Sequence, residues 1–144
     1  MKKFFFLSVL FLGLTMFTAC DKDDDDADDH SDDPVYSIMV MQPTTDDKMA
    51  GDSMHIHIEV SEASDETIHH FQVRIYNADD NTEVVYTGPS EAHVHDESGA
   101  YSYHDDFLLD VDAHTDWILE AKVWGHDAGA AEKVETVEFH VHPM

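Results

Sequence analysis

Basic residues are scarce in this chain of 144 residues. Seven lysines and arginines stand against 32 aspartates and glutamates, which gives a formal net charge of −25. A charge of this sign repels phosphate backbones and anionic lipid head groups, so we expect no nucleic acid partner. The sequence also lacks a glycine-rich phosphate loop, a Gly-x-Ser-x-Gly elbow and a paired-carboxylate motif. We therefore predict that the protein is not an enzyme.

Cysteine is almost absent as well, because Cys20 is the only one. It follows two lysines at the start of the chain and an apolar run from Phe4 to Phe17. An apolar run of about 14 residues is shorter than the roughly 20 that a membrane-spanning helix needs, and it is typical of a cleaved export signal. A single cysteine leaves no disulfide within the chain to stabilise the fold.

Residues 17–20, Phe-Thr-Ala-Cys, resemble the bacterial lipobox, in which the cysteine becomes the lipidated first residue of the mature protein. The resemblance implies that residues 1–19 are a lipoprotein signal peptide and that a lipid on Cys20 anchors the protein in a membrane. Lipidation would leave no thiol for a metal site or a nucleophile. The alternative is an ordinary secretory signal that ends in a cysteine by chance.

Residues 20–33 follow as an acidic segment with nine aspartates and no apolar side chain larger than alanine after Cys20. Such a segment buries too little surface to order itself, so we expect a disordered, extended tether. The run resembles the acidic export signal on surface lipoproteins of Bacteroidota. This resemblance implies an outer-membrane lipoprotein exposed at the cell surface, with a periplasm-facing position as the alternative.

From residue 34 onward, apolar and polar residues alternate in short segments separated by turn residues. Alternation with period two is typical of half-buried strands. We expect strands near 35–42, 53–60, 69–76, 82–86, 91–95, 100–109, 117–124 and 134–142. Seven or eight short strands within residues 34–144 predict a single immunoglobulin-like antiparallel β-sandwich, an all-β fold.

Residues 111–123 resemble the approach to the sixth strand of a fibronectin-type domain. Trp117 stands where that family usually has its corner tyrosine, and an indole can donate one hydrogen bond but cannot accept one. The resemblance implies the same sandwich fold, and it leaves the function open.

The alternation also sorts the histidines onto strand faces. In the strand near 53–60 the apolar residues point inward, which leaves His55 and His57 on the outer face. If Ser98 and Gly99 form the centre of a hairpin turn, the segments 91–95 and 100–109 pair with each other. An immunoglobulin-like sandwich places the second of these segments beside 53–60. We therefore expect five histidines to meet on one sheet face: His55, His57, His93, His95 and His104.

Neutral imidazoles without thiolates suit zinc or copper, and a tetrahedral site needs only three or four such ligands. The sequence thus predicts a lipid-anchored extracytoplasmic domain that binds a zinc or copper ion through a histidine-rich sheet face. The alternative is a polar, solvated face with incidental histidines, on a non-catalytic module that binds a protein or glycan at the cell surface.

Other histidines are interpreted as structural or solvated. His69 falls on the inward side at the start of a strand, where we expect a hydrogen-bonded edge residue. His140 and His142 share their sheet face with Lys122 and Arg74, whose charges would repel a cation.

Overall fold

The computed structural model describes residues 34–64, 66–126 and 131–144. All of these residues belong to one compact unit. The predicted signal peptide (1–19) and tether (20–33), including Cys20, lie outside the described residues. No helix in the described part of the chain is long and apolar enough to cross a membrane.

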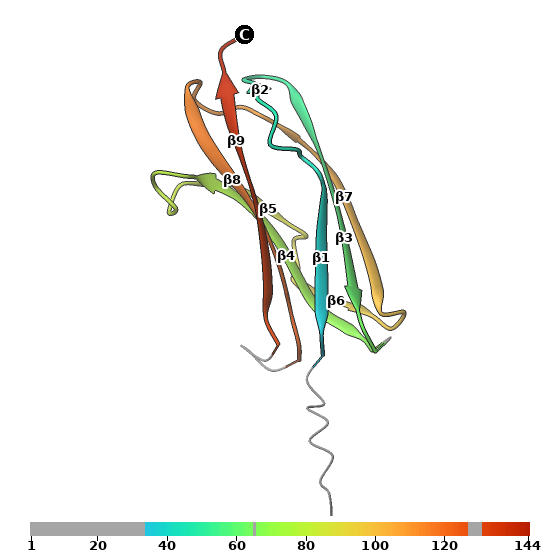
Figure 1. The fold of residues 1–144 in the computed structure, drawn as a ribbon. Helices are drawn as coiled ribbons and strands as arrows, with labels where there is room; N and C mark the ends of the chain where they lie inside the picture. The colour runs from blue at the N-terminus through green and yellow to red at the C-terminus, as the bar shows by residue number, and fades with distance from the viewer. Residues whose placement is uncertain (1–33, 65, 127–130) are drawn as a thin grey trace, which may run out of the picture. The chain divides into compact units, whose positions relative to one another are not determined.

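In the described residues, nine strands form two sheets that face each other (Figure 1). Sheet A has the order β1-β3-β7, and sheet B has the order β2-β9-β8-β4-β5, with β6 paired to β4. β2 runs parallel to β9, and the other pairs are antiparallel. The predicted β-sandwich is confirmed, and only the two-residue β2 was not expected. The strands are β1 (Tyr36–Gln42), β2 (Lys48–Met49), β3 (Ser53–Glu62), β4 (Ile68–Asn77), β5 (Val84–Gly88), β6 (His93–Asp96), β7 (Ala100–Leu108), β8 (Thr115–Trp124) and β9 (Lys133–His142).

The core consists of the inward-facing residues of both sheets. Burial of an aliphatic or aromatic side chain contributes roughly 1.5 to 3 kcal/mol, so these residues supply most of the folding free energy. Val137 on β9 is only half-buried. The core residues on the four long strands are Met54, Ile56, Ile58, Val60, Ile68, Phe71, Val73, Ile75, Trp117, Leu119, Ala121, Val123, Phe139 and Val141.

Trp117 is 1% exposed and is one of the largest fully buried side chains of the core. Its buried indole Nε1 has no hydrogen-bond partner among the described residues. The side chain therefore acts through packing, and it does not make the hydrogen bond that a corner tyrosine would make.

The predicted pairing of β6 with β7 is wrong, because β6 pairs with β4 of sheet B. The turn between β6 and β7 is held by Asp96, whose Oδ1 accepts hydrogen bonds from the backbone nitrogen (2.8 Å) and the hydroxyl (2.5 Å) of Ser98. Gly99 follows with a φ of 69°, a conformation that glycine adopts without strain. This turn carries the chain from sheet B to sheet A, so β7 pairs with β3 instead.

A buried carboxylate shapes the turn from β3 to β4. Glu62 is 4% exposed, and its carboxylate accepts hydrogen bonds from the backbone nitrogens of Val35 (3.0 Å), Ser64 (2.7 Å) and Glu66 (2.9 Å). Burial raises the pKa of Glu62, but these backbone hydrogen bonds lower it more, so the net pKa lies below its usual value. The charged carboxylate thereby fixes the entry into β4, where His69 and His70 lie.

Candidate metal centre

The structure does not bring the five predicted ligands together. His55, His57 and His104 lie on the outer face of sheet A, whereas His93 and His95 lie on β6 beside β4. The expected neighbourhood of β3 and β7 is confirmed, with His57 directly opposite His104. The other half of the prediction fails because it depended on the β6–β7 hairpin.

His93 and His95 instead join a residue of β4, and we call His69, His93 and His95 the β4–β6 histidine cluster. One ring nitrogen from each of the three lies within 4.8 Å of the other two. The ring centroids are 5.4 Å apart for His69 and His95, 5.5 Å for His93 and His95, and 6.3 Å for His69 and His93. Imidazoles bound to one tetrahedral zinc, with Zn–N bonds of about 2.0 to 2.1 Å, have ring centroids about 5 Å apart. Small side-chain movements would complete such a site.

A bulge in β6 produces this arrangement. Ile68 pairs with Asp96 and His70 pairs with His93, so two residues of β6, Val94 and His95, lie opposite the single residue His69. His95 has a φ of 48°, in the left-handed region that only a minority of non-glycine residues adopt. Bulges of this kind redirect side chains and are common beside functional sites.

His69 is a candidate ligand that the sequence analysis missed. Its Nδ1 is buried and has no hydrogen-bond partner among the described residues. Burial lowers the pKa of His69, and the neighbouring histidines 126, 95, 70 and 93 lower it further. The ring therefore stays neutral, the form that binds a metal ion, to a lower pH than an ordinary histidine. Its inward position was predicted correctly, but the hydrogen-bonded state expected for it was wrong.

Two further histidines border the cluster. The His126 ring lies 5.2 Å from His69, and the His70 ring lies 5.1 Å from His93. His70 is held in place by stacking on Trp124 at 5.1 Å, with 8° between the planes, and its Nδ1 donates a hydrogen bond to the carbonyl of Gly125 at 3.0 Å. That bond leaves the lone pair of its Nε2 available for a ligand or for water.

On sheet A, the outward-facing side chains form a hydrogen-bonded network that we call the β3–β7 face. Glu59 Oε1 accepts from Ser102 (2.7 Å) and lies 2.7 Å from His57 Nε2, while the Ser102 hydroxyl lies 3.0 Å from His104 Nε2. Hydrogen bonds from Ser102 and then from His57 lower the pKa of Glu59. His55 Nδ1 lies 2.9 Å from Asp106, its cross-strand partner.

The ring geometry of the β3–β7 face is less suited to a metal ion. Ligand atoms of His57, Glu59 and His104 lie within 4.8 Å of one another. However, the two rings stack with centroids 4.1 Å apart and 27° between their planes. Imidazole lone pairs lie in the ring plane, so nearly parallel stacked rings cannot both aim at one ion about 2 Å away without turning.

Comparisons with known proteins identify the fold. No protein-family model and no curated protein matches the sequence. The structure of the CARDB domain of a Pyrococcus furiosus protein has 12% identity and a TM-score of 0.51, and the match covers 76% of this chain and 96% of that one. A crystal structure of the same CARDB domain, in complex with di-metal ions, has 9% identity and a TM-score of 0.49 over 78% of this chain and 96% of that one.

A third similar structure is a β-glucosidase from Listeria innocua in complex with gluconolactone. It has 11% identity and a TM-score of 0.45, and the match covers 77% of this chain but only 17% of that one. At these identities the likeness concerns the fold alone. The predicted immunoglobulin-like β-sandwich is confirmed, and the function has to be argued from the chain's own residues.

Proposed function

We propose that this domain binds one divalent transition metal ion, zinc or copper, in the β4–β6 histidine cluster. His69, His93 and His95 are the ligands. The fourth position is open to water or to one of the bordering histidines, as in tetrahedral sites with three protein ligands. A lipid on Cys20 anchors the domain at the bacterial outer membrane, facing the cell surface. The resulting function is capture or storage of a metal ion outside the cytoplasm.

One observation carries the metal proposal. The buried Nδ1 of His69 has no hydrogen-bond partner among the described residues, and one ring nitrogen of His69 lies within 4.8 Å of one from His93 and one from His95. Leaving a buried polar atom unsatisfied costs about 1 to 3 kcal/mol, so folded proteins usually provide a partner for it. A metal ion shared with His93 and His95 would be such a partner. Neutral imidazoles without thiolates favour Zn²⁺ and Cu²⁺ over Mg²⁺ and Ca²⁺.

Calorimetric titration of Zn²⁺ and Cu²⁺ into tag-free protein tests the site. Millimolar Ca²⁺ in the buffer occupies the aspartate run, because hard cations prefer carboxylate oxygens. We expect His93→Ala to remove one tightly bound zinc ion per chain. His104→Ala is the matched control, since it removes another exposed histidine, on the other sheet, and this variant should keep that ion. Identical titrations of the two variants would reject the β4–β6 site.

The anchor is tested separately, because it rests on the lipobox resemblance and not on the fold. Mass spectrometry of the mature protein should find an acylated amino-terminal Cys20. Cys20→Ala should release the domain from the membrane fraction or stop its processing. An unmodified Cys20 in a secreted product would contradict the proposed location without affecting the metal site.

A further inference from the structure

A third group of histidines lies at the opposite end of sheet B, and we call His114, His140 and His142 the β8–β9 histidine cluster. One ring nitrogen from each of the three lies within 4.8 Å of the other two. Thr115, the first residue of β8, pairs with Val141, whereas Trp124 at the other end of β8 pairs with His70. The full length of β8 therefore separates this cluster from the β4–β6 cluster. β9 ends at this cluster, near the label for the C-terminus in Figure 1.

Each of two rings in the β8–β9 cluster has a carboxylate partner. His140 Nδ1 lies 2.6 Å from Asp116, its cross-strand neighbour, and His142 Nε2 lies 3.0 Å from Asp47. An ionised carboxylate can only accept a hydrogen bond, so the ring nitrogen that faces it carries the imidazole proton. The other ring nitrogen, Nε2 of His140 and Nδ1 of His142, is left with its lone pair. In metal sites, a histidine that binds the ion with one ring nitrogen usually donates the N–H of the other to a carboxylate, which fixes the orientation of the ring.

The ring planes of this cluster can converge on one ion. His140 and His142 have centroids 4.7 Å apart and planes at 64°, and His114 lies 6.5 Å from His142 with planes at 86°. Steeply crossed planes allow in-plane lone pairs to meet, unlike the stacked rings of the β3–β7 face. His114 is held by its backbone nitrogen, which donates to the carbonyl of Val141 at 2.7 Å, and its φ of 62° sets the direction of the side chain.

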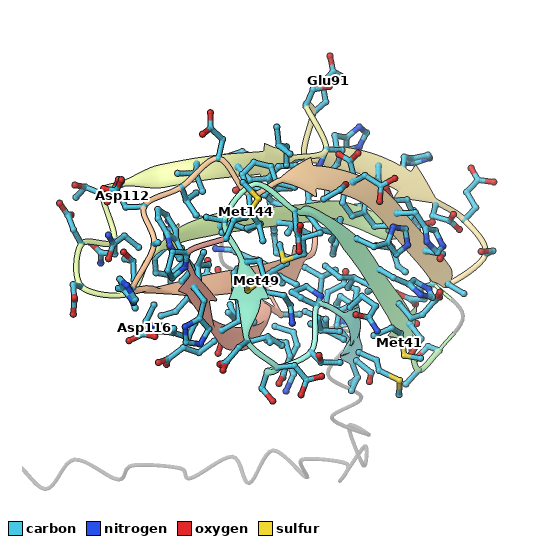
Figure 2. The ribbon with its side chains drawn as sticks, turned by 90° about the horizontal axis from the view of Figure 1, so that it is seen from above. Met41, Met49, Glu91, Asp112, Asp116 and Met144 are labelled. Atoms are coloured by element: carbon cyan, nitrogen blue, oxygen red, sulfur yellow. The ribbon has the colours of Figure 1, made fainter. Side chains whose placement is uncertain are left out.

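The electrostatic objection raised from the sequence does not apply to this end of the sheet. Arg74 forms a two-pronged ion pair with Glu120, at 2.8 and 3.2 Å. Lys122 pairs with Glu132. Both positive charges are thus compensated, and the carboxylates of Asp116 and Asp47, which contact the cluster rings, attract a cation. Lys48 of β2 lies opposite Val141, and its ammonium donates to the backbone carbonyls of Thr44 and Asp46. Figure 2 looks down on this end of the molecule, with Asp116 labelled near its rim.

We propose that His114, His140 and His142 form a second site for a divalent transition metal ion. The fourth coordination position is open to water, and Asp116 and Asp47 are positioning residues that fix the ring tautomers. Asp47 precedes β2, so an ion bound here also ties the segment before β2 to the end of β9. The site shares no residue with the β4–β6 histidine cluster, so each of the two proposed sites can be tested independently of the other.

The test uses the full chain with the first site removed by His93→Ala and His95→Ala, again in millimolar Ca²⁺. Titration with Zn²⁺ should still show one site per chain. Titration with Co²⁺ should give the visible absorption bands of a four-coordinate ion with nitrogen ligands. Adding either His140→Ala or His114→Ala, which replaces an exposed residue, should abolish both signals. The second site would be rejected if both of these variants kept the signals. It would also be rejected if the protein with only His93→Ala and His95→Ala gave no signal.

The role of the carboxylate is tested in the same background. Asp116→Asn should weaken zinc binding about 10- to 100-fold, as loss of an outer-shell partner typically does, and Asp116→Glu should restore part of the affinity. Asp79→Asn is the control, because Asp79 is an exposed aspartate in the turn after β4. Equal affinities in the Asp116→Asn and Asp79→Asn proteins would reject the positioning role. Zinc binding at the β4–β6 histidine cluster is measured separately, by titrating the single variant His140→Ala.

Discussion

His93 of β6 lies directly opposite His70 of β4, and their ring centroids are 5.1 Å apart. This pairing places β6 in sheet B and brings His93 and His95 beside the half-buried His69. The histidines of the described residues thus fall into separate clusters, each with its own ring geometry. Metal binding by this domain is therefore a question about individual clusters and not about overall histidine content.

Zinc should stabilise the folded protein, because an ion that binds only the native state adds free energy by mass action. At a free zinc concentration of 100 times the dissociation constant, one site contributes about 2.7 kcal/mol. We expect His93→Ala to remove about this much of the zinc-dependent stability and to leave the apoprotein nearly unchanged. Urea denaturation with zinc and with a chelator measures the difference. The control His55→Ala, on the outer face of sheet A, should retain the full gain.

Replacement of the buried carboxylate at the end of β3 should destabilise the fold. Glu62→Gln keeps the shape of the side chain but turns an amide donor toward backbone nitrogens that also donate. An unsatisfied buried donor costs about 1 to 3 kcal/mol, which is the expected loss of unfolding free energy in urea. Glu135→Gln, at an exposed position of β9, should change stability by less than about 0.5 kcal/mol. Similar losses in the two variants would contradict the role of Glu62.

The same carboxylate predicts how stability depends on pH. The pKa of Glu62 is lower in the folded protein than its ordinary value of 4.5, so its ionised form stabilises the fold. This contribution is complete above about pH 4.5 and is lost as the pH falls through the folded pKa. The stability difference between wild type and Glu62→Gln should therefore shrink in acid. A difference that is constant from pH 7 to pH 3 would show that the charge of Glu62 plays no part.

Gly88 lies at a close contact between the two sheets. A Cβ at this position would overlap the hydroxyl of Tyr103, and it would come within 2.5 Å of the hydroxyl of Tyr86. These hydroxyls lie 2.5 Å apart, and that of Tyr86 also donates to Asp105 at 2.6 Å. Overpacking of this kind costs about 1 to 3 kcal/mol, so Gly88→Ala should lower the midpoint of thermal unfolding. Adding Tyr103→Phe to Gly88→Ala removes one of the overlapping hydroxyls and should restore part of the lost melting temperature. If it restores none, the clash with Tyr103 is not the cause of the destabilisation.

Much of the fold could be predicted from the sequence, because strands have a strict period of two. The alternation of Met54, Ile56, Ile58 and Val60 with polar residues specifies which side of β3 is buried, whatever its neighbours are. The same rule placed His55 and His57 outside and His69 inside. The topology of an immunoglobulin-like sandwich led to the correct prediction that His57 and His104 lie on neighbouring strands, and β3 and β7 pair over nine positions.

The partner of β6 was decided only by the tertiary structure. β6 has four residues, and neither of its neighbours in the chain compels a pairing, since the turn at Ser98 and Gly99 can end a hairpin or cross between the sheets. The bulge opposite His69 and the left-handed conformation of His95 exist only once β6 lies against β4. The alternation of residue types along the chain thus determined which face of its strand a histidine side chain occupies. Which imidazoles meet at one point depended on contacts between segments distant in sequence, which a period of two does not encode.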